Sequence, residues 1–311
     1  MKTLFNINAQ RKLCTVLAGG AALMLVSSYA TAGISTTRHN LTSSTGNQLT
    51  VTGGNGEICV FCHTPHGSET NASVPIWNRN LGTNIYTRYI SLNTTTFDAA
   101  EAPIGSVSIA CLSCHDGTQA MNVMINTPGS GTTGSLTGTW SSGTNVTAAG
   151  FMTSTLANNN LAGKGEFPRL GTDLSNDHPI SMQYGGGGIS DGNFASTGPA
   201  SALGAITVDW DFAQPSGNAS PSARTGAGIG GVGTRLIGSG KRVWWVEVDG
   251  IAGQSKTDMT LYSRTDTSGS GANQPMVECA SCHDPHSNNT TFLRHPSGNA
   301  GSATCLTCHN K

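Results

Sequence analysis

Apolar residues are concentrated in one long stretch near the N-terminus of this 311-residue chain. The stretch runs from Leu13 to Tyr29, follows three basic residues and is closed by the small residues Ala30-Thr31-Ala32. This pattern is typical of a secretory signal peptide, so we predict that residues 1–32 are a leader cleaved after Ala32. The stretch is too short, and too interrupted by glycine, for a transmembrane helix, and we expect no membrane insertion. We expect an exported protein, extracellular or at the cell surface, or alternatively periplasmic.

Beyond the leader, the pattern of apolar positions predicts few regular elements. Two segments are strand candidates: Arg242 to Val248, which ends at an Asp-Gly turn, and Met259 to Ser263, which can pair with it. The rest of residues 117–272 is dense in Gly, Ser, Thr and Asn, which favour turns. The predicted fold class is mostly irregular coil, with short helices at the cysteine motifs described below and a few short β-strands.

The composition limits both the core and the partners. Hydrophobic residues make up 36% of the chain and charged residues 11%, and there are 41 glycines. The chain therefore lacks the apolar content of an ordinary domain of its length. Without the leader, the formal charge is −4, from 13 Lys and Arg (16 less the three in the leader) against 17 Asp and Glu. Because the chain has no excess or cluster of Lys and Arg, we do not expect nucleic acid as a partner.

The pattern that carries chemistry is Cys-x-x-Cys-His, which occurs four times. In this spacing two thiols attach the vinyl groups of a c-type haem and the His binds its iron. Zinc-binding and redox-active Cys-x-x-Cys motifs do not require that His, whereas all four copies have it. We therefore predict four covalently attached haems c. The attachment cysteines are Cys59, Cys62, Cys111, Cys114, Cys279, Cys282, Cys305 and Cys308, and the proximal iron ligands are His63, His115, His283 and His309.

These motifs organise the expected domain. Residues 33–311 are predicted to form one haem-cored unit, with a haem pair at 59–115, a Gly/Ser/Thr-rich insertion at about 117–272 and a second haem pair at 279–309. Four macrocycles fixed by thioether and axial bonds can hold a loop-rich chain together, much as metals and disulfides hold small domains.

Five histidines remain as candidates for the sixth ligand of four irons. Methionine is the competing ligand, but the methionines are scattered, whereas two of the spare histidines repeat one placement. His66 and His286 each lie three residues beyond a proximal His, after a proline, and three residues cannot reach round the rim of a macrocycle. We expect each to bind a neighbouring iron, His66 in the N-terminal half and His286 in the C-terminal half. The predicted distal ligands are His39, His66, His178 and His286, and His295 is left without a role.

The blocks around these histidines resemble a known family. The Cys-His-Thr-Pro-His-Gly and Cys-His-Asp-Pro-His-Ser sequences, the Asp-His-Pro loop at His178 and the closing Cys-Leu-Thr-Cys-His resemble the doubled-CxxCH multihaem cytochromes. The four-haem layout with an N-terminal His is similar to the extracellular tetrahaem cytochromes of the OmcE type. This resemblance implies stacked bis-histidine haems and subunits polymerised into filaments, with His39 binding an iron of the neighbouring subunit.

The expected function is electron transfer, and we do not expect an enzyme. A catalytic haem needs an open coordination position, whereas here histidines outnumber the positions to be filled, which argues against a multihaem reductase. Within the electron-transfer class, we expect an extracellular filament subunit whose partners are copies of itself and redox proteins or extracellular electron acceptors. A monomeric periplasmic tetrahaem shuttle is the alternative.

Overall fold

The structure is a computed structural model, and it describes residues 33–42, 57–94, 101–127, 134–135, 150–152, 169–184, 212–213, 232–237, 241–249, 253–264 and 274–309. The chain divides into two compact units, Met1–Gly33 and Ile34–Lys311. The predicted signal peptide lies outside the described residues, as does most of the Gly/Ser/Thr-rich insertion.

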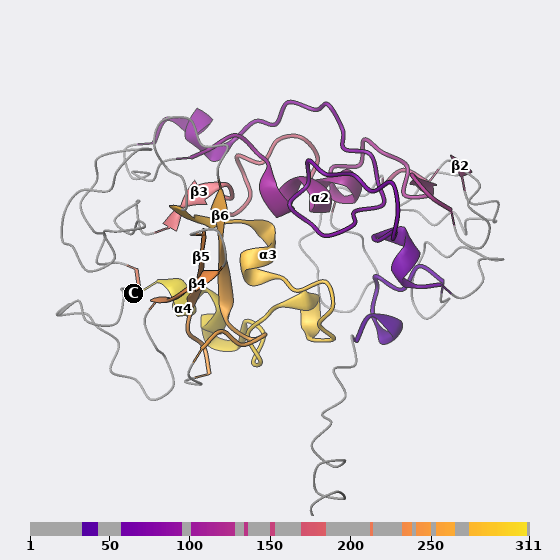
Figure 1. The fold of residues 1–311 in the computed structure, drawn as a ribbon. Coiled ribbons are helices and arrows are strands. Elements are labelled where there is room, and N and C mark those ends of the chain that lie inside the picture. Colours follow the sequence, from indigo (N-terminus) through magenta and orange to yellow (C-terminus); the bar gives the residue numbers. More distant parts are fainter. Residues whose placement is uncertain are drawn as a thin grey trace, which may run out of the picture. The chain divides into compact units, whose positions relative to one another are not determined.

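A five-stranded antiparallel sheet, in the order β3-β7-β6-β5-β4, lies in the C-terminal half of the second unit (Figure 1). In the predicted hairpin, Trp244 of one strand pairs with Leu261 of the other. The sheet is larger than the few short strands expected, because two strands contain Gly233 or Pro275, residues that weaken a strand pattern in sequence. The strands are β3 (Met182–Gln183), β4 (Val232–Ile237), β5 (Lys241–Val246), β6 (Met259–Arg264) and β7 (Gln274–Val277).

Each Cys-x-x-Cys-His motif lies on a helical segment, as the sequence predicts. The four segments are η2 (Cys59–Phe61), α2 (Ser106–His115), α3 (Cys279–Cys282) and α4 (Ala303–Cys308). Helix α3 directly follows β7, so the sheet leads into the third motif. The remaining short elements are η1 (Gly33–Thr36), η3 (Tyr89–Leu92), η6 (Thr290–Phe292), η7 (Ala300–Ser302) and the paired strands β1 (Val123–Met124) and β2 (Gly134–Ser135).

The apolar core of the described residues is divided into four clusters rather than one. The largest surrounds Trp244 and Met259 on the sheet, and Cys282 and Cys308 pack against it. Three smaller clusters lie in the N-terminal half, and each has Cys62 or Cys114 packed against it. Every cluster therefore touches the second cysteine of at least one motif, so the apolar side chains gather where the predicted haems are attached.

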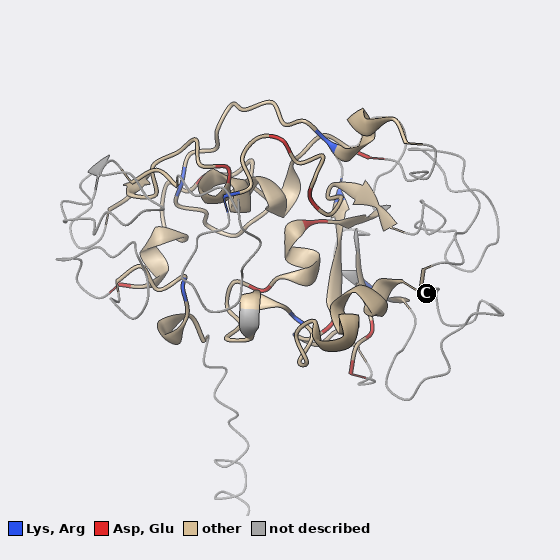
Figure 2. Cartoon of the chain, turned by 180° about the vertical axis from the view of Figure 1, so that it is seen from behind, with Lys and Arg blue, Asp and Glu red and all other residues tan. Residues whose placement is uncertain are grey.

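Charged residues are sparse in the structure. Figure 2 shows Lys, Arg, Asp and Glu at a few scattered positions in the described part of the chain. Among the described residues, none of the helices combines the length and the apolar content that crossing a bilayer requires.

Candidate functional site

The local backbone of the motifs places both thiols and the imidazole on one side. In three motifs the amide of the His donates to the carbonyl of the first cysteine, over 2.9 Å at His63, 3.1 Å at His283 and 3.0 Å at His309. This is the i to i−4 bond of a helical turn, in which residues i, i+3 and i+4 share a face. Two thioethers and one iron bond can therefore reach the same macrocycle without rearranging the turn.

The proximal rings are held in the tautomer that a metal requires. Nδ1 of His63 lies 2.9 Å from the carbonyl oxygen of Pro75, and Nδ1 of His283 lies 2.8 Å from that of Thr291. A carbonyl oxygen only accepts, so we assign the ring hydrogen to Nδ1 in both residues. The lone pair of Nε2 is then free, and the carbonyl fixes the ring orientation as outer partners of metal-binding histidines commonly do.

Two imidazoles from opposite ends of the chain face each other at His63 and His286. Their ring centroids are 6.1 Å apart and their planes differ by 9°. Two imidazoles that share a metal, each bonded at about 2 Å, have centroids roughly 6 Å apart. The centroid spacing would therefore suit two ligands of one iron. The ring beside His286 belongs to the N-terminal half, whereas the sequence-based assignment gave His286 an iron of the C-terminal half. Which iron His286 binds stays a prediction.

The carboxylate of Asp284 supports this arrangement at His286. Its Oδ1 atom lies 3.4 Å from Nδ1 of His286 and also accepts the His286 backbone amide at 2.9 Å. The hydrogen bonds to His286 lower the pKa of Asp284, although burial opposes them. An ionised carboxylate beside Nδ1 leaves Nε2 as the atom available to a metal and fixes the orientation of the ring.

His39 forms a second facing pair, with His115 of the same chain. The two centroids are 6.3 Å apart and the planes are inclined by 69°. The C-terminal segment holds His39 in place: its ring stacks on Phe292 at 4.2 Å, and its Nδ1 lies 3.4 Å from the carbonyl oxygen of Pro285. Burial, followed by the charge of His115, lowers the pKa of His39 to about 4. The ring is therefore neutral at physiological pH, as a ligand must be.

The other two predicted distal ligands are not brought against a second imidazole in the described part of the chain. His66 is exposed, and its backbone carbonyl accepts from Asn126 at 2.7 Å. His178 is also exposed, with Nδ1 2.9 Å from the carbonyl oxygen of Pro179, so its Nε2 is free by the same tautomer argument. The proximal His309 packs on Phe212 at 4.6 Å.

His295 differs from all of these in its tautomer. Its Nδ1 accepts the backbone amide of Ser297 at 3.1 Å, so in the neutral ring Nε2 carries the hydrogen. Binding a metal through Nε2 would require that hydrogen to leave or this hydrogen bond to break. This hydrogen bond is unfavourable for iron binding by His295, whose role stays open.

Comparison with known proteins agrees with this chemistry at the C-terminal end of the chain. Residues 273–311 match the family model of the doubled CXXCH motif. No curated protein matches the chain. The matched segment holds the third and fourth motifs. These motifs indicate covalently bound c-type haem and an electron-transfer cytochrome.

The doubled CXXCH segment also contains site residues that the sequence argument did not single out. Asp284 lies between the proximal His283 and the distal His286, and its position in Cys-His-Asp-Pro-His was the available signal. Glu278 precedes the segment's first cysteine and is buried at 1% exposure, with no motif to mark it.

Proposed function

We propose that the protein is a tetrahaem electron carrier in which every iron has two histidine ligands. The observation that carries the proposal is the facing pair of His63 and His286, whose free Nε2 atoms and 6.1 Å spacing fit one iron. Haem supplies reversible one-electron oxidation and reduction of its iron when it is attached. Two protein ligands on each iron leave no position for a substrate, which supports electron transfer over catalysis.

The remaining ligands follow from the reach of the chain. Because His286 faces His63, its three-residue tether brings the haem of His283 next to the haem of His63. His66 is on an equal tether from His63, so we assign it reciprocally to the iron of His283. His39 is assigned to the iron of His115 by its 6.3 Å spacing, and His178 is left for the iron of His309. Each of these two haems would then receive its distal ligand from the segment that follows the other haem's proximal His. Because both segments are only three residues long, this favours close stacking of the first and third haems.

The position of His39 supports a self-contained carrier as the principal form. The filament model reserves His39 for a neighbouring subunit, whereas here its ring is packed between Phe292 and His115 of its own chain. With that ligand supplied internally, no iron needs a second copy of the protein. We therefore propose an exported, monomeric shuttle that exchanges electrons with redox proteins or extracellular acceptors.

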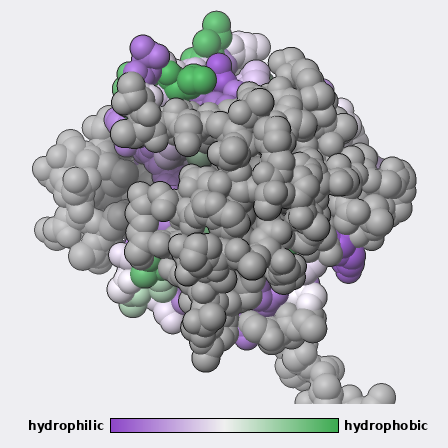
Figure 3. Space-filling view, turned by 90° about the vertical axis from the view of Figure 1, so that its left-hand side faces the viewer, coloured by the Kyte–Doolittle hydropathy of each residue, from purple (hydrophilic) through white to green (hydrophobic). Residues whose placement is uncertain are grey.

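A filament subunit is the second candidate, and exposed apolar side chains favour it. Ile85 is 94% exposed, and Ile90 and Leu92 of η3 are 48% and 47% exposed. Figure 3 shows apolar side chains grouped at the upper edge of one face. Burying such side chains between copies would be favourable, at roughly 25 cal/mol for each Å² removed from water.

The proposed function is tested on the secreted, haem-loaded protein. Intact mass should equal the chain after cleavage plus four haems, and the oxidised spectrum should be fully low-spin, with little binding of carbon monoxide after reduction. A smaller haem load, or one high-spin iron per chain, would refute the tetrahaem bis-histidine assignment. Light scattering then distinguishes the two forms, because the shuttle stays monomeric as concentration rises and the filament subunit does not.

A further inference from the structure

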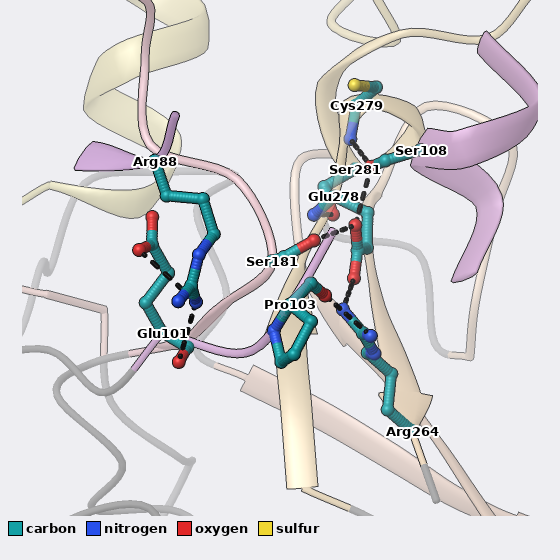
Figure 4. A network of polar contacts seen from close by, with 9 residues as sticks. All are labelled: Arg88, Glu101, Pro103, Ser108, Ser181, Arg264, Glu278, Cys279 and Ser281. Atoms are coloured by element: carbon teal, nitrogen blue, oxygen red, sulfur yellow. Dashed lines mark hydrogen bonds and ion pairs between the residues drawn. The ribbon is translucent and has the colours of Figure 1, made fainter. Parts of the chain in front are cut away.

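A buried carboxylate lies between the second and third haem-attachment motifs. Glu278 precedes Cys279 at the start of α3, and its side chain is fully buried. Its Oε2 accepts the hydroxyl of Ser108 from α2 at 2.5 Å and that of Ser181 at 3.1 Å. Figure 4 shows these groups converging on the carboxylate from separate segments of the chain. Glu278 thus joins the helices of two motifs.

The charge of Glu278 is paired with an equally buried cation. Nη1 of Arg264, on β6, lies 3.2 Å from Oε1 of Glu278, and the two side chains are 2% and 0% exposed. Nη2 of Arg264 donates to the carbonyl oxygen of Pro103 at 2.8 Å. Removing such a pair from water costs about as much as its attraction returns, so stability alone does not account for it.

The network reaches the haem-attachment cysteines directly. Ser108 donates to Glu278 and accepts the backbone amide of Cys279 at 3.0 Å. Cys111 lies one turn further along α2 than Ser108, so Ser108 links the amide of Cys279 to the helix that carries Cys111. The thioether ends of the second and third haems therefore meet beside Glu278. The same point is a contact between the N-terminal and C-terminal halves of the chain.

We infer that Glu278 is a positioning residue for the second and third haems and holds their reduction potentials below the value that a neutral side chain would give. The inference rests on the proposed function. Burial raises the pKa of Glu278, and the Ser108 hydroxyl and the charge of Arg264 oppose that shift. An oxidised haem carries one more positive charge than a reduced one, so the ionised carboxylate stabilises the oxidised state. The positive charge of Arg264 offsets part of this effect. The carboxylate, however, is the member of the ion pair that adjoins both motifs.

The test compares reduction potentials of the haem-loaded, full-length protein and its variants. Glu278→Gln keeps the shape of the side chain and removes its charge. We expect two of the four potentials to rise while the other two stay unchanged, with four haems still attached by mass. The matched control is Glu101→Gln, which also removes the charge of a carboxylate in an ion pair. Oε2 of Glu101 lies 3.6 Å from Arg88 and accepts the backbone amide of Ile90. Figure 4 shows both pairs. The control should leave all four potentials unchanged.

Three outcomes would overturn the inference: four potentials that shift together, no shift in the loaded Glu278→Gln protein, or an equal shift in the control. If Glu278→Gln does not accumulate, the double variant Glu278→Gln with Arg264→Gln replaces it, because it leaves no buried charge unpaired. Two potentials should rise in that variant as well, and their failure to do so would overturn the inference. Failure of the proposed function is seen separately, since a wild-type protein with fewer than four haems or a high-spin iron reveals it before any variant is compared.

Discussion

The imidazoles of His63 and His286 are parallel to within 9°, with centroids 6.1 Å apart, although one belongs to the first motif and the other follows the third. Their hydrogen-bond partners differ, a backbone carbonyl for His63 and a carboxylate for His286, yet both partners assign the ring hydrogen to Nδ1. The C-terminal half therefore brings an imidazole to the first motif of the N-terminal half. In the proposed carrier this contact interleaves the two haem pairs.

Replacing His286 by Ala should remove one axial ligand and leave every haem attached. Attachment depends on the thioethers, so intact mass should still show four haems, while one iron per chain becomes high-spin and binds carbon monoxide. His295→Ala is the matched control from the same segment, because its Nδ1 already accepts the amide of Ser297. A low-spin spectrum that survives His286→Ala would show that another residue fills the position.

Replacing His39 by Ala distinguishes the shuttle from the filament. Because His39 faces His115 within the chain, the variant should have one high-spin iron and keep the hydrodynamic size of the wild type. Size-exclusion chromatography and the visible spectrum together measure both quantities. If the wild type is polymeric and the variant is not, His39 crosses between subunits and the carrier model is wrong.

Lowering the pH, and not raising it, should release His39 from its proposed iron. Burial lowers the pKa of His39 to about 4, below the value of 6.5 expected in the unfolded chain. Between these two values the unfolded state binds the extra proton, so stability rises with pH across this window and is lost as pH falls through about 4. An acid titration of the low-spin spectrum should show a transition at or below this value. His39→Met, whose thioether does not titrate there, should remove that step.

A buried polar contact after the second motif should contribute to stability without affecting the irons. Asp116 is fully buried and accepts the hydroxyl of Tyr86 at 2.8 Å and the amide of Thr118, also at 2.8 Å. Burial raises the pKa of Tyr86, so its hydroxyl remains protonated and donates. Tyr86→Phe should lower the free energy of unfolding by about 1 kcal/mol, measured by denaturant titration. The low-spin spectrum should not change, and a high-spin iron would instead show that Asp116 positions His115.

The motifs could be recognised from the sequence because their chemistry is local. Two thiols and an imidazole within one helical turn need no tertiary information. The hairpin of β5 and β6 follows from two runs rich in β-branched and aromatic residues, the first closed by an Asp-Gly turn signal. The full sheet could not be predicted, because β4 and β7 carry residues that are unfavourable in strands and are stabilised by their neighbours.

The partner of His286 could not be predicted for a related reason. Its short tether limits how far it reaches from His283, but which iron lies within that reach depends on how the halves pack. That packing rests on contacts such as Ser108 with Glu278, which join residues distant in sequence and leave no periodic pattern. The tautomer of His295, set by the amide of Ser297, is likewise visible only in three dimensions.

The contacts of residues 285–292 have a consequence for biogenesis. Pro285 and Phe292 hold His39 against His115, and His286 faces His63, so both N-terminal sites take a distal ligand, or its support, from a segment near the end of the chain. If the haems are loaded and ligated as proposed, thioether attachment at the first two motifs does not need residues 285–292, whereas completing the coordination of their irons does. Attachment and coordination at these two motifs would then depend on different parts of the chain.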